Sequence, residues 1–222
     1  MARSVVLAGS RRCERCELSP RWCICAGRDD VVLPFQVDVL IHQREQWRPT
    51  STGRLIDRAV SGARAHIYHR DLPLQPADIV QPGKVLWILH PLGEPMPPAP
   101  PLDQLQVLLL DGSWGEAAAM MKGVEGWGRR ISLPMAGKSR YWLRSQQGAG
   151  LFSTVEALLF LLRALKLDEA HHRLRLQFEL QVYAGLRLRG KKTAAEEFLV
   201  DSPIRTAMAD LIADLSRRRP HE

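Results

Sequence analysis

All four cysteines of the 222-residue chain fall within thirteen residues. Two residues separate Cys13 from Cys16, and one residue separates Cys23 from Cys25. Two close pairs of thiolates can complete a tetrahedral shell around Zn²⁺. Because four sulfurs leave no open position for a reacting ligand, we expect a structural zinc ion. Redox disulfides are the alternative, which suits a cytosolic chain less well.

A second group of polar residues follows the apolar run at residues 107–110. Asp111, Gly112, Ser113 and Trp114 end this run, and residues suited to a helix come next. In open α/β sheets, ligands bind beyond the carboxyl ends of the strands, which is where this carboxylate, hydroxyl and indole would lie. The alternative is structural, with Asp111 or Ser113 as a helix cap and Trp114 in the core.

Two more segments have the pattern of a polar loop that leads into a helix. Residues 50–53 offer three hydroxyl groups and a glycine that permits close backbone approach, ahead of helical spacing from residue 54. Ser153 and Glu156 have the spacing of a capping box before the apolar residues 157–162. Each segment can be an ordinary helix start or a ligand contact, and Glu156 can lie at the edge of the same site.

The elements that must position these residues follow a repeated order of strand, polar loop and helix. Apolar runs with β-branched residues predict strands at residues 31–41, 66–69, 85–89, 105–110 and 131–134. Helical spacing predicts helices from residue 54, at 115–122, from 153 and at 207–215. Residues 173–184 alternate like a strand but also tolerate a helix, which we favour. The order predicts an α/β fold.

Composition limits the class of protein. The chain has 45% hydrophobic residues, and none of its apolar runs approaches the roughly 20 residues of a membrane helix. We therefore expect a cytoplasmic globular protein without a membrane partner. The 31 Lys and Arg against 24 acidic residues give a net charge of +7, which favours a nucleic acid as partner. The alternative is an evenly basic, solvated surface.

The motifs together resemble the DTW-domain family, the tRNA-uridine aminocarboxypropyltransferases. They occur in the family's order and are Cys13-x2-Cys16-x6-Cys23-x-Cys25, His42-x2-Glu45, Ser51-Thr52-Gly53-Arg54-Leu55, Asp111-Gly-Ser-Trp114, Arg144, and Ser153-Thr154-x-Glu156-Ala157. Two positions depart from the family's pattern. Ser113 replaces the usual threonine and keeps its hydroxyl, whereas Ser51 replaces an asparagine and lacks its amide.

The resemblance implies one α/β domain similar to the SPOUT-type RNA methyltransferases, and it leaves open whether the chain is knotted. We expect a zinc-binding module at residues 1–30, a catalytic domain at residues 31–222, and helices at the C-terminus. The implied reaction moves the 3-amino-3-carboxypropyl group of S-adenosylmethionine, a co-substrate, to N3 of a tRNA uridine and releases methylthioadenosine. A monomer is favoured.

The resemblance also suggests roles for individual residues. Uridine N3 must lose its proton as it attacks, and Asp111 is the predicted acceptor, with a structural or donor-binding role as the alternative. The predicted donor-binding residues are Thr52, Gly53, Ser113, Trp114, Thr154 and Glu156. The predicted contacts to tRNA are Arg140, Arg144, Lys191 and Lys192.

Two other functions fit the same residues. One is modification of ribosomal RNA or methyl transfer to RNA, both dependent on S-adenosylmethionine, in the same fold. The other is a zinc-bearing RNA-binding module without catalysis, for which the cysteines and arginines would matter and Asp111 and Trp114 would not.

Overall fold

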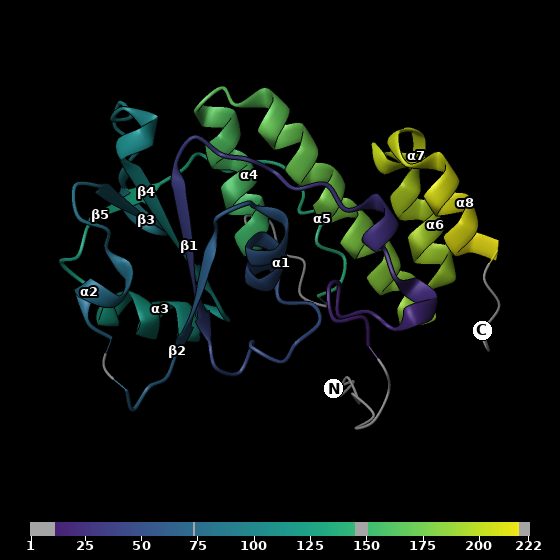
Figure 1. Ribbon diagram of the computed structural model, residues 1–222, viewed down its shortest axis with the longest axis horizontal. Coiled ribbons are helices and arrows are strands. Elements are labelled where there is room, and N and C mark those ends of the chain that lie inside the picture. The colour runs from purple at the N-terminus through teal and green to yellow at the C-terminus, as the bar shows by residue number, and fades with distance from the viewer. Residues whose placement is uncertain (1–11, 73, 145–150, 218–222) are drawn as a thin grey trace. The chain divides into compact units, whose positions relative to one another are not determined.

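The computed structural model describes residues 12–72, 74–144 and 151–217, and these form two compact units (Figure 1). One unit is Asp29–Phe178. The other contains the described residues up to Arg28 together with those from Glu179 onward. Residues 12–28 thus share a unit with C-terminal helices, and the predicted domains 1–30 and 31–222 stay a prediction.

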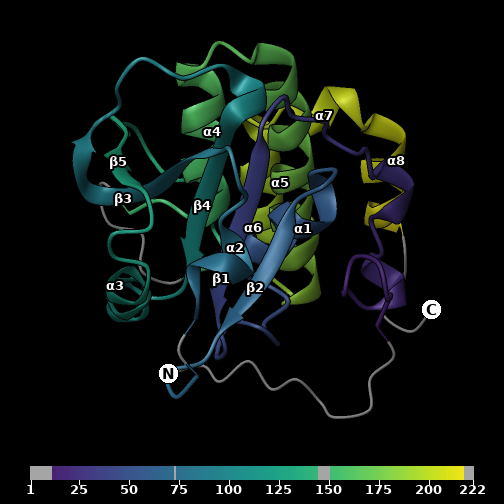
Figure 2. The same ribbon diagram turned by 60° about the vertical axis from the view of Figure 1, so that its left-hand side comes forward.

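The larger unit contains a parallel five-stranded sheet, as the α/β prediction required. Its strands are β1 (Gln36–His42), β2 (Arg64–Tyr68), β3 (Val85–Pro95), β4 (Leu105–Asp111) and β5 (Arg129–Ser132). Across the sheet their order is β2-β1-β4-β3-β5 (Figure 2). The two central strands, β1 and β4, pair in a register that sets Ile41 beside Asp111. The polar segments after β1 and β4 therefore begin next to each other.

Helices cover both faces of this sheet, which explains why its central strands are apolar almost throughout. Helices α1 (Thr52–Ala59) and α4 (Thr154–Ala164) contact each other and β4 on one face (Figure 1). On the other face, α2 (Pro76–Ile79) and α3 (Trp114–Gly123) pack on a core of buried residues. That core consists of Leu40, Ile79, Leu86, Ile88, Leu108, Met120, Met121 and Val124.

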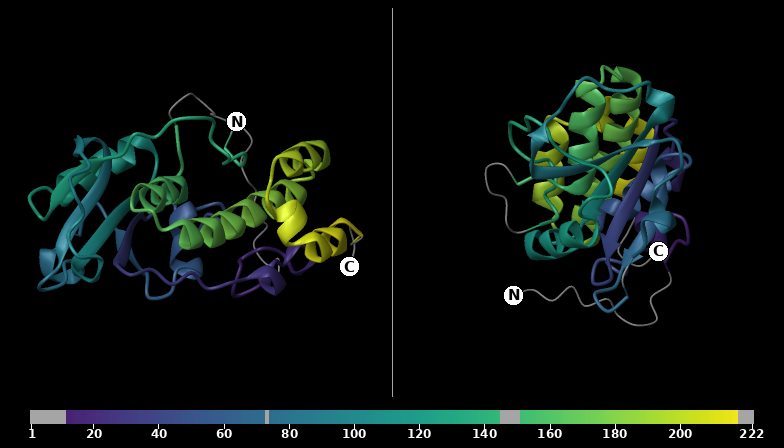
Figure 3. Two further views of the ribbon diagram at one scale, coloured as in Figure 1. Left: turned by 90° about the horizontal axis from the view of Figure 1, so that it is seen from above. Right: turned by 90° about the vertical axis from the view of Figure 1, so that its left-hand side faces the viewer.

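Helix α5 (Asp168–Leu188) follows α4 after a short turn in which Lys166 has a positive φ of 57° (both helices are green in Figure 3). The segment 173–184, whose alternation also fits a strand, is therefore helical as favoured. Side chains without a branch at Cβ, such as those of Leu174, Gln177 and Leu180, suit a helix, and apolar residues buried around the helix produce the apparent alternation. Among the described residues no helix has the length and apolar character to cross a membrane.

The smaller unit consists of the cysteine segment and short helices. Its elements are two 3₁₀ turns at Pro20–Trp22 and Cys25–Gly27, the C-terminal part of α5, α6 (Lys192–Val200), α7 (Ile204–Ala207) and α8 (Ala209–Arg217). Trp22 is buried, and the guanidinium carbons of Arg21 and Arg187 lie 4.6 and 5.0 Å from its ring centroid. A Cβ on Gly27 would lie 2.6 Å from Leu211 Cδ2, so this turn packs closely.

A buried ionic network joins the two central strands, β1 and β4, to the edge strand β2. Asp38 is fully buried, and its Oδ1 accepts a hydrogen bond from Arg64 Nε at 2.8 Å and lies 2.7 Å from His66 Nε2. Gln106 Nε2 donates to Oδ2 at 2.7 Å. Burial alone would raise the pKa of Asp38, but these hydrogen bonds lower it on balance. These side-chain hydrogen bonds of the sheet therefore stabilise the ionised form of Asp38.

We expect Asp38→Ala to lower the free energy of unfolding by about 3 kcal/mol at neutral pH, because Arg64 and Gln106 each lose their contact with the buried carboxylate. This value is at the low end of the cost of breaking a buried ion pair, because the Arg64 side chain is 39% exposed. The contribution is complete above the ordinary carboxyl pKa of 3.8 and is lost as pH falls through the lowered folded-state pKa. Urea unfolding measures the change. Glu94→Ala breaks the exposed pair with Arg129 and should cost below about 1 kcal/mol; equal losses in the two variants would contradict the prediction.

Candidate functional site

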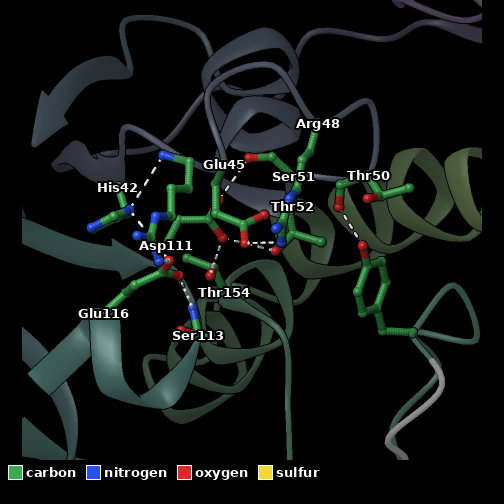
Figure 4. Close-up of polar contacts among 12 residues, drawn as sticks. His42, Glu45, Arg48, Thr50, Ser51, Thr52, Asp111, Ser113, Glu116 and Thr154 are labelled. Carbon is green, nitrogen blue, oxygen red and sulfur yellow. Dashed lines mark hydrogen bonds and ion pairs between the residues drawn. The ribbon is translucent and has the colours of Figure 1, made fainter. Parts of the chain in front are cut away.

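Asp111, the last residue of β4, ties together the starts of two helices. Its Oδ2 accepts from the Ser51 hydroxyl at 2.6 Å, and its Oδ1 accepts from Thr52 at 3.3 Å and from Thr154 at 2.5 Å (Figure 4). Ser51 is the N-cap of α1, and Thr52 and Thr154 are the first residues of α1 and α4. The carboxylate is fully buried. Three segments far apart in the sequence therefore meet at one carboxylate.

Ser51 makes two contacts of its own. Its Oγ accepts from the backbone N–H of Arg54 at 3.1 Å, as an N-cap does, while it donates to Asp111. A hydroxyl can accept one hydrogen bond and donate another, so both contacts form without the amide of an asparagine. The residue after Thr52 must be small, because a Cβ on Gly53 would lie 2.7 Å from Asp111 Cβ and 2.9 Å from its Oδ2.

A second buried carboxylate, Glu45, lies at the same edge of the sheet. It follows β1 by three residues, is 2% exposed, and receives a 2.5 Å hydrogen bond from Arg48 Nη1 at its Oε1 (Figure 4). Burial raises the pKa of Glu45, opposed by the charges of Arg48 and Arg144 and reinforced by Asp111 and Glu116. Glu45 belongs to the His42-x2-Glu45 motif, but it is not among the site residues predicted from the sequence.

Ser113 and Trp114 lie where β4 passes into α3. Ser113 is the N-cap, and its backbone N–H donates to Glu116 Oε2 at 2.8 Å in a capping box. Burial would raise the pKa of Glu116, but the hydrogen bonds from Ser113 and the charges of His42 and Arg48 lower it on balance. Trp114 is 58% exposed. It is therefore not the core residue of the structural alternative, and its indole is available to a ligand.

Glu156 holds a neighbouring loop and makes no hydrogen bond to Asp111. Its carboxylate accepts from the backbone N–H and the hydroxyl of Ser153, both at 2.7 Å, which completes the predicted capping box. The same carboxylate accepts from Ser139 Oγ and from the Arg140 backbone N–H. Tyr141, the next residue, donates its hydroxyl to the Thr50 carbonyl oxygen. This loop is thereby attached to the starts of both α1 and α4.

The predicted RNA-binding residues divide between the two units. Arg140 is half-buried and Arg144 is exposed in the larger unit, and their guanidinium groups lie near the rings of Trp142 and Tyr141. Lys191 and Lys192 are exposed at the start of α6 in the smaller unit. Only the two arginines therefore belong to the same compact unit as Asp111.

The four cysteines lie together in the smaller unit. Their Sγ atoms are all within 4.8 Å of one another, with Cys13–Cys25 at 3.5 Å and Cys16–Cys23 at 3.8 Å. None of the four is in a disulfide. With Zn–S bonds of about 2.3 Å, the sulfurs of a tetrahedral site lie roughly 3.8 Å apart. The donor set and the spacing therefore fit a structural zinc ion.

The environment of the thiols also suits a cation. Backbone N–H groups of Cys16 and Arg15 lower the pKa of Cys13 to about 6. Burial instead raises the pKa values of Cys16 and Cys25. Thiolates at these two positions consequently require a positive charge beside them, which a bound metal ion would supply.

We expect freshly purified protein to contain about one zinc ion per chain, bound at the four-thiolate site. In Cys16→Ser, which removes one ligand, the ratio should fall well below one, while Asp111→Asn should leave it unchanged. Elemental analysis by mass spectrometry measures both. A ratio well below one in the unaltered protein would argue against this site.

Comparison with known families identifies the chain through these same residues. A family model described as DTW domain matches residues 10–184, which include the four cysteines, Asp111 and Glu156. The chain belongs to the DTW domain family. Membership is consistent with the predicted role in tRNA modification. No solved structure matches the chain.

Proposed function

We propose that this DTW protein transfers the 3-amino-3-carboxypropyl group of S-adenosylmethionine to N3 of a uridine in tRNA. The observation that carries the proposal is the convergence of α1 and α4 on Asp111, because the three segments that meet there contain DTW-family motifs. Family membership and the chain's charge of +7 support tRNA as the acceptor.

The chemistry of this edge suits the donor. The first N–H groups of α1 and α4 have no acceptor within their helices and can bind the donor's carboxylate, as predicted for the segments of Thr52 and Thr154. The hydroxyls of these two threonines already donate to Asp111, so they act by fixing the helix starts. Glu45, Asp111 and Glu116 form an anionic group suited to a sulfonium cation, and the exposed Trp114 can add a cation–π contact.

The proton on uridine N3 goes to a carboxylate. Asp111 is the acceptor predicted from the sequence, but both of its oxygens already accept hydrogen bonds from hydroxyls. Glu45 is the second candidate, and its geometry favours it: Oε2 has no hydrogen-bond partner among the described residues, and burial raises its pKa toward the range of a general base. We therefore propose that Glu45 accepts the proton and that Asp111 positions the helix starts.

The transfer forms one bond and breaks one bond at the γ carbon of the donor. Glu45 takes the N3 proton, the N3 electron pair forms a bond to the γ carbon of the donor, and the bond from that carbon to sulfur breaks. Sulfur keeps the electron pair and leaves as neutral methylthioadenosine. The protein's contribution is to align the γ carbon, in preference to the less hindered methyl carbon, with N3.

The SPOUT-like character of the domain is part of the proposal. A parallel sheet with a site beyond the carboxyl ends of its central strands supports it. Whether the chain is knotted stays open, as in the sequence prediction, and residues 145–150 between β5 and α4 lie outside the described residues.

The test is incubation of the protein with an unmodified tRNA transcript and S-adenosylmethionine, followed by digestion and mass spectrometry of the nucleosides. We expect a uridine that carries the aminocarboxypropyl group. A methylated nucleoside would support RNA methyl transfer in its place. An unmodified RNA that nevertheless binds tightly would support the non-catalytic module.

A further inference from the structure

The loop between β1 and α1 presents one large aromatic side chain to solvent. Trp47 is 77% exposed, although the backbone around it is held by hydrogen bonds. The Glu45 N–H donates to the His42 carbonyl at 2.7 Å, and the Arg48 N–H donates to the Glu45 carbonyl at 3.0 Å. Arg54 Nη1 donates to the Gln46 carbonyl at 2.6 Å. The loop is thus fixed on both sides of the indole.

A fixed, exposed tryptophan requires an explanation, because burying an indole would stabilise the fold. Trp47 is not part of the core of the sheet and its helices, so it does not stabilise the fold by burial. Its position suggests a ligand at the same edge as Asp111, since Ile41 near the end of β1 pairs in register with Asp111. The exposed Trp114 follows Asp111 at that edge.

Positive charge flanks the indole. Arg44 and Arg48 lie three residues before and one residue after Trp47, and their side chains are 75% and 57% exposed. Arg48 pairs with Glu45 through one nitrogen (Figure 4), and Arg44 lies 3.9 Å from Glu116. An exposed aromatic ring with exposed arginines close by in the same loop is complementary to an unpaired nucleotide, whose base stacks and whose phosphates are anionic.

We propose that residues 43–50 form a binding surface for an unpaired nucleotide of the RNA substrate, with the base stacked on Trp47 and neighbouring phosphates on Arg44 and Arg48. This inference rests on the proposed function in taking RNA as the acceptor. It adds a prediction about the acceptor: the reactive uridine lies in a single-stranded segment or is unstacked on binding. Base-paired RNA offers no free base face to the indole.

The experiment measures binding of a short oligouridylate without the methionine-derived donor, so that failure of transfer does not affect it. In Trp47→Leu, which keeps an apolar side chain without a π face, we expect Kd to rise about 5- to 150-fold. Trp47→Phe should retain most of the affinity. Binding should quench tryptophan fluorescence in the unaltered protein by more than it does in Trp47→Phe. A duplex of equal length should bind without this additional quenching.

Controls separate stacking from other uses of the surface. Val32→Ala removes an exposed apolar side chain near the start of β1 and should leave Kd unchanged. Equal affinity of Trp47→Leu and the unaltered protein for oligouridylate would overturn the proposal, as would heparin binding as tightly as the oligonucleotide with the same quenching. If Trp47→Leu changes the molecular mass in solution but not RNA binding, the surface is a protein contact and the proposal is wrong.

Discussion

Asp111→Asn is expected to lower the rate of aminocarboxypropyl transfer by at least about 100-fold, because misplacement of reacting groups by about 1 Å costs this much. Asparagine keeps one acceptor oxygen but turns an NH₂ group toward hydroxyls that now donate to Asp111. The starts of α1 and α4 therefore shift, and donor affinity falls with the rate. Single-turnover kinetics and calorimetric titration with S-adenosylmethionine measure the two effects.

Asp38→Asn is the matched control. Asp38 is also a fully buried aspartate in a central strand, but it lies in the amino-terminal part of β1 and contacts Arg64 and Gln106. Asp38→Asn should be less stable than the unaltered protein. At a temperature where both variants are folded, its rate of aminocarboxypropyl transfer should fall much less than that of Asp111→Asn. RNA binding should be nearly unchanged in Asp111→Asn. A rate within about threefold of the unaltered enzyme would contradict the central place of Asp111.

Glu45→Gln should lower the transfer rate by about 10²- to 10⁴-fold, which is the usual contribution of a general base. Glutamine keeps a hydrogen bond to Arg48 but cannot take the N3 proton. The rate of the unaltered enzyme should rise with pH through the pKa of Glu45, which burial raises above its ordinary value of 4.5. This pH dependence, the acid limb of the profile, should vanish in Glu45→Gln, while the unfolding transition stays close to normal.

Two further variants decide which carboxylate takes the proton. Arg48→Gln removes a charge that lowers the pKa of Glu45, so the acid limb should move to higher pH. Glu116→Gln alters a carboxylate of the same edge and should keep the limb. If the limb disappears in Asp111→Asn and survives in Glu45→Gln, Asp111 is the proton acceptor, and our assignment of Glu45 is wrong.

Local patterns were enough to predict most elements of the fold. The capping box at Ser153 and Glu156 is where the sequence indicates it, and β4 ends at Asp111 one residue beyond the predicted run. Strand β5 also occupies part of its predicted range. These features depend on residues that are within a few positions of each other in the sequence. Over that range, a pattern of apolar and polar residues predicts secondary structure.

The meeting of distant segments at Asp111 could not be predicted from such patterns. Its partners Ser51 and Thr154 are 60 and 43 residues away in the sequence. Ser51 reaches Asp111 because β1 and β4 are neighbours in the sheet, although β2 and β3 lie between them in the chain. The same pairing brings Glu45 near Asp111. The sequence does show that Glu45 follows one predicted strand and that Asp111 ends another. This places the two carboxylates close together only if the two strands are known to be neighbours in the sheet.

Trp47 illustrates a second limit of sequence reasoning. The segment Gln43-Arg-Glu-Gln-Trp-Arg48 is a polar run with one aromatic residue, and an isolated tryptophan is usually buried at least in part. Its side chain is 77% exposed in a loop whose backbone is fixed by hydrogen bonds at Gln46 and Arg48. Exposure of this kind is a property of the folded chain.

The most direct test of the central claim follows two labels of the donor in parallel. One sample of S-adenosylmethionine carries the label in its carboxyl carbon and the other in its methyl carbon, and each is incubated with the protein and unmodified tRNA. We predict carboxyl label in a uridine of the RNA, no methyl label in the RNA, and release of methylthioadenosine. Methyl label in the RNA together with S-adenosylhomocysteine would contradict the account.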